Sequence, residues 1–190
     1  MVSYRRRVLS AAAVMVVSCC GTIAASYAFV DREAIQYRTF SELCAEAPSS
    51  QSLKSLWEIL STNFSVAAAL VLGGFLIGIR TVIQLVVVGA DLGQHIAAAH
   101  ITTNSWTLTV AALGTHGALE LAALAAAGAT GLGLAEVVVR KVIRRSQEPW
   151  RESAKALARE LIGPAIGLLI AALIEEFLTS SLIRQVLGCG

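Results

Sequence analysis

The sequence is poor in charged and in aromatic residues. Only 15% of its 190 residues are charged and 6% are aromatic, whereas soluble globular domains carry about a quarter charged residues. Hydrophobic residues make up 56% of the chain, and the mean hydropathy is +0.70. They are mostly Ala, Leu, Val and Ile in long runs, which is typical of lipid-facing helices. The composition therefore argues against a soluble domain and predicts an integral membrane protein in contact with the lipid bilayer.

A large net charge of either sign is also absent. The formal net charge is +2, and the basic residues lie between apolar runs rather than in a stripe that could follow phosphates. We therefore expect no nucleic-acid partner.

The first apolar run, residues 8–30, is long enough to cross a bilayer core of about 30 Å. Arg5, Arg6 and Arg7 precede it, and such a basic cluster favours a cytoplasmic N-terminus. Ser26-Tyr27-Ala28 resembles a signal-peptide cleavage site, and Cys19 resembles a lipoprotein acceptor. Because the run is longer than a typical signal core and further spans follow, we interpret it as an uncleaved anchor.

Four further apolar runs complete a prediction of five spans. Arg80 divides the run from residue 63 to 99 into two spans, with Arg80 at the cytoplasmic face. This division makes the next run travel inward and delivers the basic residues after it to the cytoplasm, as the positive-inside rule requires. The predicted spans are residues 8–30, 63–79, 81–99, 106–139 and 161–186.

The Lys and Arg residues are then distributed unevenly between the two sides. Those predicted on the cytoplasmic side are residues 5, 6, 7, 80, 140, 141, 144, 145, 151, 155 and 159, and those predicted outside are residues 32, 38, 54 and 184. We therefore predict an all-α transmembrane bundle with a cytoplasmic N-terminus.

Two predicted spans have alternatives. Residues 81–99 are short for a span and contain Asp91, so a re-entrant segment remains open. Residues 106–139 would exceed about 45 Å as one straight helix, and their glycines offer places to bend or break it.

The segments between the spans carry three further predictions. Residues 31–62 form an outer loop in which Leu53, Leu56, Trp57 and Leu60 recur at helical spacing, predicting a short amphipathic helix. Residues 140–160 form a basic cytoplasmic loop. Cys44 and Cys189 both fall on the outer side, where they form either a disulfide or two free thiols.

Three glycine pairs with small-xxx-small spacing lie in the spans. They are Gly74 with Gly78, Gly89 with Gly93, and Gly163 with Gly167. Such pairs let helix backbones approach closely. We favour packing within one chain over a dimer interface, and a homo-oligomer remains open.

Five ionisable residues stand out at membrane depth, where such groups are costly and usually functional. They are Asp91, His116, Glu120, Glu175 and Glu176. His116 and Glu120 are four residues apart and share a helix face. Only one of the adjacent Glu175 and Glu176 is expected to face the interior, and we favour Glu175.

Two motifs resemble the stage II sporulation protein M (SpoIIM) family. His116-Gly117-Ala118-Leu119-Glu120 is similar to its His-Gly-x-x-Glu signature, and Ala171–Thr179 is similar to its Ala-Ala-x-Ile-Glu-x-Phe-x-Thr stretch. Asn63, which opens an apolar run, fits the same family. Thr115 stands where the family commonly has Pro, and Gly89-Ala90-Asp91 replaces an Asn-Gly.

The resemblance implies a multi-pass protein of a bacterial plasma membrane. Founding members of the family act in a septal complex that remodels peptidoglycan, and short relatives accompany the precursors of circular bacteriocins. The resemblance therefore suggests a small peptide precursor or other membrane proteins as partners.

Three functions remain open from the sequence. His116, Glu120 and Glu175 could ligate Zn²⁺ or another divalent metal and activate water for a membrane-embedded peptidase, transpeptidase or peptide cyclase. A metal-free version would use a carboxylate as general base and His116 as general acid. Alternatively, the three residues form a structural cluster in a scaffold, immunity protein or complex subunit, or they serve ion or small-solute transport. The expected supporting residues are Asn63, Asp91, Glu176 and Thr179.

Overall fold

The chain is described here from a computed structural model, which covers residues 2–29, 53–145 and 149–187. The described residues are helical and contain no strand, and five of the helices are long and apolar enough to cross a membrane. The predicted all-α bundle with five spans is thereby confirmed. Its α-helices are α1 (Tyr4–Phe29), α3 (Leu53–Leu72), α4 (Ile79–Thr103), α5 (Trp106–Val138), α6 (Trp150–Ile174) and α7 (Ser180–Leu187).

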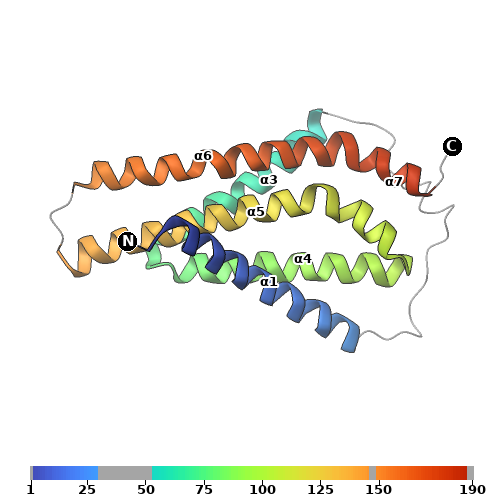
Figure 1. Ribbon diagram of the computed structural model, residues 1–190, viewed down its shortest axis with the longest axis horizontal. Coiled ribbons are helices and arrows are strands. Elements are labelled where there is room, and N and C mark those ends of the chain that lie inside the picture. The colour runs from blue at the N-terminus through green and yellow to red at the C-terminus, as the bar shows by residue number, and fades with distance from the viewer. Residues whose placement is uncertain (1, 30–52, 146–148, 188–190) are drawn as a thin grey trace.

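Helix α5 is the centre of the bundle (Figure 1). It packs against α1, α3, α4 and α6, whereas α1 packs mainly on α4. The hydrophobic cluster at this centre is built from small and medium side chains, among them Ala11, Leu70, Leu85 and Ala127. The scarcity of aromatic residues thus corresponds to a bundle whose helices lie close together.

A tight turn separates α3 from α4. It consists of a 3₁₀ turn, Gly73–Leu76, followed by Ile77 and Gly78 in left-handed conformation. The hydroxyl of Thr81 donates a hydrogen bond of 2.9 Å to the carbonyl of Leu70 and so ties the two helices together across the turn. The apolar run therefore forms two helices, separated by a turn just before Arg80, and α4 is a continuous helix that is long and apolar enough to cross a membrane.

The long run of α5 is one helix without a break. Figure 1 shows that it changes direction in its first part, toward α7. Gly128, Gly131 and Gly133 do not interrupt it, and each of them lies against a neighbouring helix. At Gly131 an added Cβ would collide with the carbonyl oxygen of Leu70, and at Gly128 it would meet the side chain of Leu85.

The described parts of two segments predicted as loops are helical. The residues expected in a separate amphipathic helix, from Leu53 to Leu60, are the first turns of α3, because no glycine or proline interrupts the chain before Leu72. Much of the predicted basic loop belongs to a π-helical turn, Val139–Ile143, and to the start of α6, which Pro149 precedes. The predicted pairing of Cys44 with Cys189 lies outside the described residues and stays a prediction.

The glycine pair on α4 serves packing within the chain, the interpretation favoured above. A Cβ at Gly89 would collide with the backbone of Met15, and one at Gly93 would collide with that of Cys19. By contrast, a Cβ at Gly163 would meet no atom within 4 Å.

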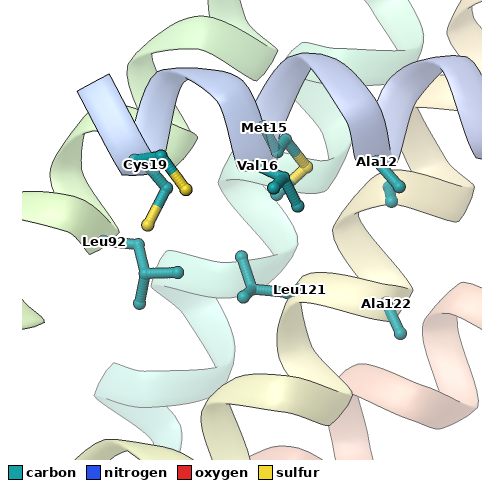
Figure 2. Close-up of a pocket in the computed structure, with 9 residues that line it drawn as sticks. Ala12, Met15, Val16, Cys19, Leu92, Leu121 and Ala122 are labelled. Atoms are coloured by element: carbon teal, nitrogen blue, oxygen red, sulfur yellow. The ribbon is translucent and has the colours of Figure 1, made fainter. Parts of the chain in front are cut away.

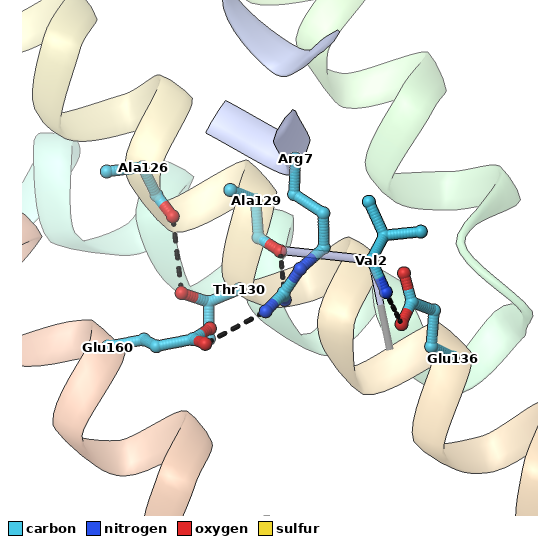
Figure 3. A network of polar contacts seen from close by, with 7 residues as sticks. All are labelled: Val2, Arg7, Ala126, Ala129, Thr130, Glu136 and Glu160. Atoms are coloured by element: carbon cyan, nitrogen blue, oxygen red, sulfur yellow. Dashed lines mark hydrogen bonds and ion pairs between the residues drawn. The ribbon is translucent and has the colours of Figure 1, made fainter. Parts of the chain in front are cut away.

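A buried ion pair links three helices near the N-terminus (Figure 3). Arg7 is only 4% exposed. Its guanidinium donates one hydrogen bond of 2.8 Å to the carbonyl of Ala129 on α5 and another of 2.8 Å to the carboxylate of Glu160 on α6. Arg5 and Arg6 are exposed, so the three consecutive arginines have different roles.

The orientation of the bundle is predicted from its charges. Because Lys and Arg are retained on the cytoplasmic side, reporter fusions within residues 141–159 should report the cytoplasm and fusions within residues 31–55 the opposite side. Finding both segments on one side would contradict the five-span topology.

Candidate functional site

His116, Glu120 and Glu175 converge between α5 and the end of α6. One potential ligand atom of each residue lies within 4.8 Å of the other two. His116 and Glu120 are one turn apart on α5, so their side chains leave the same face. The Nε2 atom of His116 is 4.0 Å from a carboxylate oxygen of Glu175. The structure therefore brings together the three residues that the sequence singled out.

Thr179 orients the imidazole ring of His116. Its hydroxyl donates to the carbonyl of Ile174 at 3.3 Å and lies 3.1 Å from His116 Nδ1. A hydroxyl has a single hydrogen, so when it is donated to Ile174 the oxygen of Thr179 accepts from Nδ1–H. We assign this tautomer, in which the unprotonated Nε2 faces Glu175. The lone pair of Nε2 and the negative carboxylate of Glu175 repel each other, so their facing arrangement is favourable when a cation or a proton lies between them.

A π-helical turn, Glu175–Thr179, shapes one side of the site. The expectation that Glu176 would turn away is wrong, because Glu176 is only 7% exposed whereas the side chain of Glu175 is 34% exposed. A π turn is closed by i→i+5 hydrogen bonds and separates adjacent side chains by a smaller angle than an α-helix does. Both carboxylates can therefore lie on the inner side, with Glu175 as the one that reaches His116.

The expected supporting residues Asn63 and Asp91 are not part of the three-residue cluster. Asn63 is buried in α3, and among the described residues no hydrogen bond connects it to the cluster. Asp91 is exposed on α4, where its carboxylate lies 3.6 Å from His95 Nδ1 and near enough to Glu120 to interact with it electrostatically. Thr179, by contrast, has a hydrogen bond to His116.

Cys19 and Cys20 line an apolar cavity of about 280 Å³ between α1, α4 and α5 (Figure 2). Met15, Leu92 and Leu121 line the same cavity, and no histidine is among its lining residues. The two thiols therefore lack the imidazole partner that activates a cysteine nucleophile, and they act as small apolar groups.

Sequence reasoning missed an aromatic cluster that joins α1, α4 and α5. The hydroxyl of Tyr27 lies 2.6 Å from His100 Nδ1, and the His100 ring stacks on Trp106 with centroids 4.0 Å apart. Tyr27 lies 73 residues before His100 along the chain, and the three residues match no spacing pattern. The sequence signal available was the presence of polar aromatic residues at the ends of apolar runs, where they favour membrane interfaces.

The three-residue cluster has the donor types of a zinc site. Histidine and glutamate side chains both ligate zinc, and catalytic zinc sites have three protein ligands with a fourth position left for water. Ligand atoms around one zinc ion lie about 3.4 Å apart, so rotation of the two flexible glutamate side chains would have to bring these atoms about 1 Å closer. The hydrogen bond that His116 donates to Thr179 is the kind of contact that orients metal-binding histidines. The residues therefore fit a divalent metal.

Comparison with known protein families gives a match over most of the chain. The family described as stage II sporulation protein M matches residues 10–180, which include the whole cluster and Thr179. No curated protein and no solved structure matches the chain.

Proposed function

Because the chain belongs to the stage II sporulation protein M family, we propose that it is a metal-dependent peptidase or transpeptidase embedded in a bacterial cell membrane. Its site would consist of His116, Glu120 and Glu175, and its substrate would be a small secreted peptide. The observation that carries this proposal is the convergence of the three ligand atoms within 4.8 Å of one another, on helices that are long and apolar enough to cross a membrane.

The cost of burying charged groups supports a functional site. Two carboxylates held close together at membrane depth repel each other and lose hydration. A divalent cation would neutralise both of them at once. Thr179 would hold the His116 ring with Nε2 toward that cation. The three-residue cluster would thus bind the cation, and Thr179 would orient one of its ligands.

The proposed reaction is the hydrolysis or exchange of an amide bond. A bound divalent cation would supply Lewis acidity and an activated water. The second carboxylate oxygen of Glu120 could accept the proton of that water and pass it to the leaving amine. The carbon–oxygen bond forms as the carbon–nitrogen bond breaks; in the transpeptidase version, the amine of another residue attacks in place of water.

Metal analysis of the purified full-length protein tests the proposal. After loading with Zn²⁺ and washing, we expect about one zinc per chain. Glu120→Gln and Glu175→Gln each remove a ligand and should abolish stoichiometric zinc. Thr179→Val removes the contact that orients His116 and should weaken zinc affinity by about 10–100-fold.

Glu176→Gln is the matched control, since it changes a neighbouring buried carboxylate outside the three-residue cluster. It should retain zinc, provided that its thermal unfolding is cooperative. Equal loss of zinc in Glu175→Gln and Glu176→Gln would contradict the proposed ligand set.

A structural role for the same cluster is the second candidate. It is favoured by the hydrogen bond from His116 to Thr179, which connects α5 to the π turn. In that case the wild-type protein would retain no zinc, and Glu120→Gln would lower thermal stability without affecting metal content.

A further inference from the structure

The outward face of α4 is polar along much of its length. Arg80, Asp91, Gln94 and His95 are exposed, and Gln84 is half-buried. We call these five residues the polar stripe. Except for Arg80 in the first turn, they lie within the interior of a helix that qualifies as a membrane span.

The polar stripe lies opposite the packing face of α4. The buried residues of this helix recur every four positions and contact the rest of the chain; they are Thr81, Leu85, Gly89, Gly93 and Ala97. At about 100° per residue, the stripe points away from this buried face. The polar residues are therefore not directed into the core of their own bundle.

Hydrocarbon is an unfavourable environment for this stripe. Polar side chains in membrane helices almost always face a bundle interior or a water-filled cavity, because an unsatisfied polar group in lipid costs several kcal/mol. Within α4, His95 Nδ1 lies 2.8 Å from the backbone carbonyl of Asp91 and 3.6 Å from its carboxylate. The side-chain amides of Gln84 and Gln94 make no hydrogen bond to any described residue, so they remain available to a partner.

We propose that the polar stripe is the interface of a homodimer, in which α4 packs against α4 of a second copy. Copies in one membrane share their orientation, so a two-fold axis along the membrane normal makes the two helices parallel. Residues 80, 84, 87, 91, 94 and 98 follow the alternating spacing of three and four that lets two helices pack along a continuous seam.

The chemistry of the stripe is self-complementary in this arrangement. Across a parallel two-fold seam a residue meets its own counterpart and the residues one turn away. Gln84 would face Gln84 of the second copy, and carboxamides both donate and accept hydrogen bonds. Asp91 would lie near His95 of the second copy, and this contact would occur twice. The stripe contains one acidic residue and two residues that can be cationic, so it carries no block of like charge.

Cysteine cross-linking in membranes tests the interface. Val87 and Val86 form a matched pair, because both are valines with similar exposure, 51% and 44%, yet they point about 100° apart on the helix. In a full-length chain whose four native cysteines are replaced by alanine, oxidation should link Val87→Cys into a dimer and should leave Val86→Cys monomeric. In the full-length protein Gln94→Leu should lower the dimer association constant about threefold for each hydrogen bond removed, the average measured for such bonds in membranes.

Single-molecule photobleaching of the labelled full-length protein in dilute liposomes gives an independent measurement. Two bleaching steps support the homodimer, whereas single steps for nearly all particles would overturn it. Equal cross-linking of Val86→Cys and Val87→Cys would place the contact elsewhere on α4. A Val87→Cys product whose mass differs from that of a dimer would mean that another membrane protein occupies the stripe. Because zinc content is not measured in these experiments, their outcome is independent of the proposed metal site.

Discussion

Replacing Arg7 by methionine is expected to destabilise the bundle by about 3–5 kcal/mol, because it leaves the partly buried carboxylate of Glu160 without its partner. The guanidinium of Arg7 is buried from solvent, and it also donates a hydrogen bond to the carbonyl of Ala129. Removing it costs two charge-assisted hydrogen bonds and uncouples α1 from α5 and α6. Unfolding by titration with a denaturing detergent in mixed micelles would measure the loss.

Arg6→Met is the matched control for this substitution. It removes the same side chain from the adjacent, exposed position, and we expect a change within about 0.5 kcal/mol. The double variant Arg7→Met/Glu160→Leu removes both charges and should recover most of the stability, as replacement of whole buried ion pairs often does. If Arg6→Met and Arg7→Met were equally harmful, the ion pair would not be the cause.

Gly131→Ala should give the second large loss of stability. An added Cβ at Gly131 overlaps the backbone carbonyl of Leu70, and the side chain of Thr81 lies 3.0 Å from the same point. Backbone atoms cannot move aside as a flexible side chain can, so α3 and α5 would have to separate. Overpacking of this kind costs about 1–3 kcal/mol, and the same detergent titration would measure it.

Gly21→Ala provides the comparison for that experiment. It introduces the same methyl group into α1 of the same bundle, where an added Cβ would meet no atom within 4 Å. Because alanine favours helix more than glycine does, this change should be neutral or stabilising by up to about 1 kcal/mol. A loss of stability in Gly21→Ala as large as that in Gly131→Ala would show that close helix contact is not the reason.

Much of the architecture could be predicted because the information is local. Long apolar runs and the position of Arg80 were enough to place five spans, since a helix must bury its backbone groups to cross lipid. His116 and Glu120 could be paired because their spacing places them on one helix face. Glu175 was found because an acidic residue within an apolar run is unusual.

The parts that escaped prediction depend on contacts between distant segments. Arg7 is one of three consecutive arginines, and nothing in its neighbourhood distinguishes it from Arg6. Its partner Glu160 lies 153 residues later. The burial of Glu176 follows from the π turn Glu175–Thr179. The local sequence would equally permit an ordinary α-helix there, so the π turn could not be predicted from it. The extension of α6 into the basic segment was missed because charge pattern predicts sidedness rather than helix ends.

The bond between Arg7 and Glu160 has a consequence for the order in which the protein is assembled. The first helix leaves the ribosome before either α5 or α6 exists, and Arg7 cannot reach Glu160 until translation has advanced by 153 residues. At about 5–20 residues per second, this delay lasts about 8–30 s. During that time α1 must be held in the membrane by its apolar residues and by the insertion machinery. A nascent chain that stops before α6 could pack α1 on α4 and α5 but would lack the ion pair between Arg7 and Glu160, so formation of this pair reports that the last long span has been made.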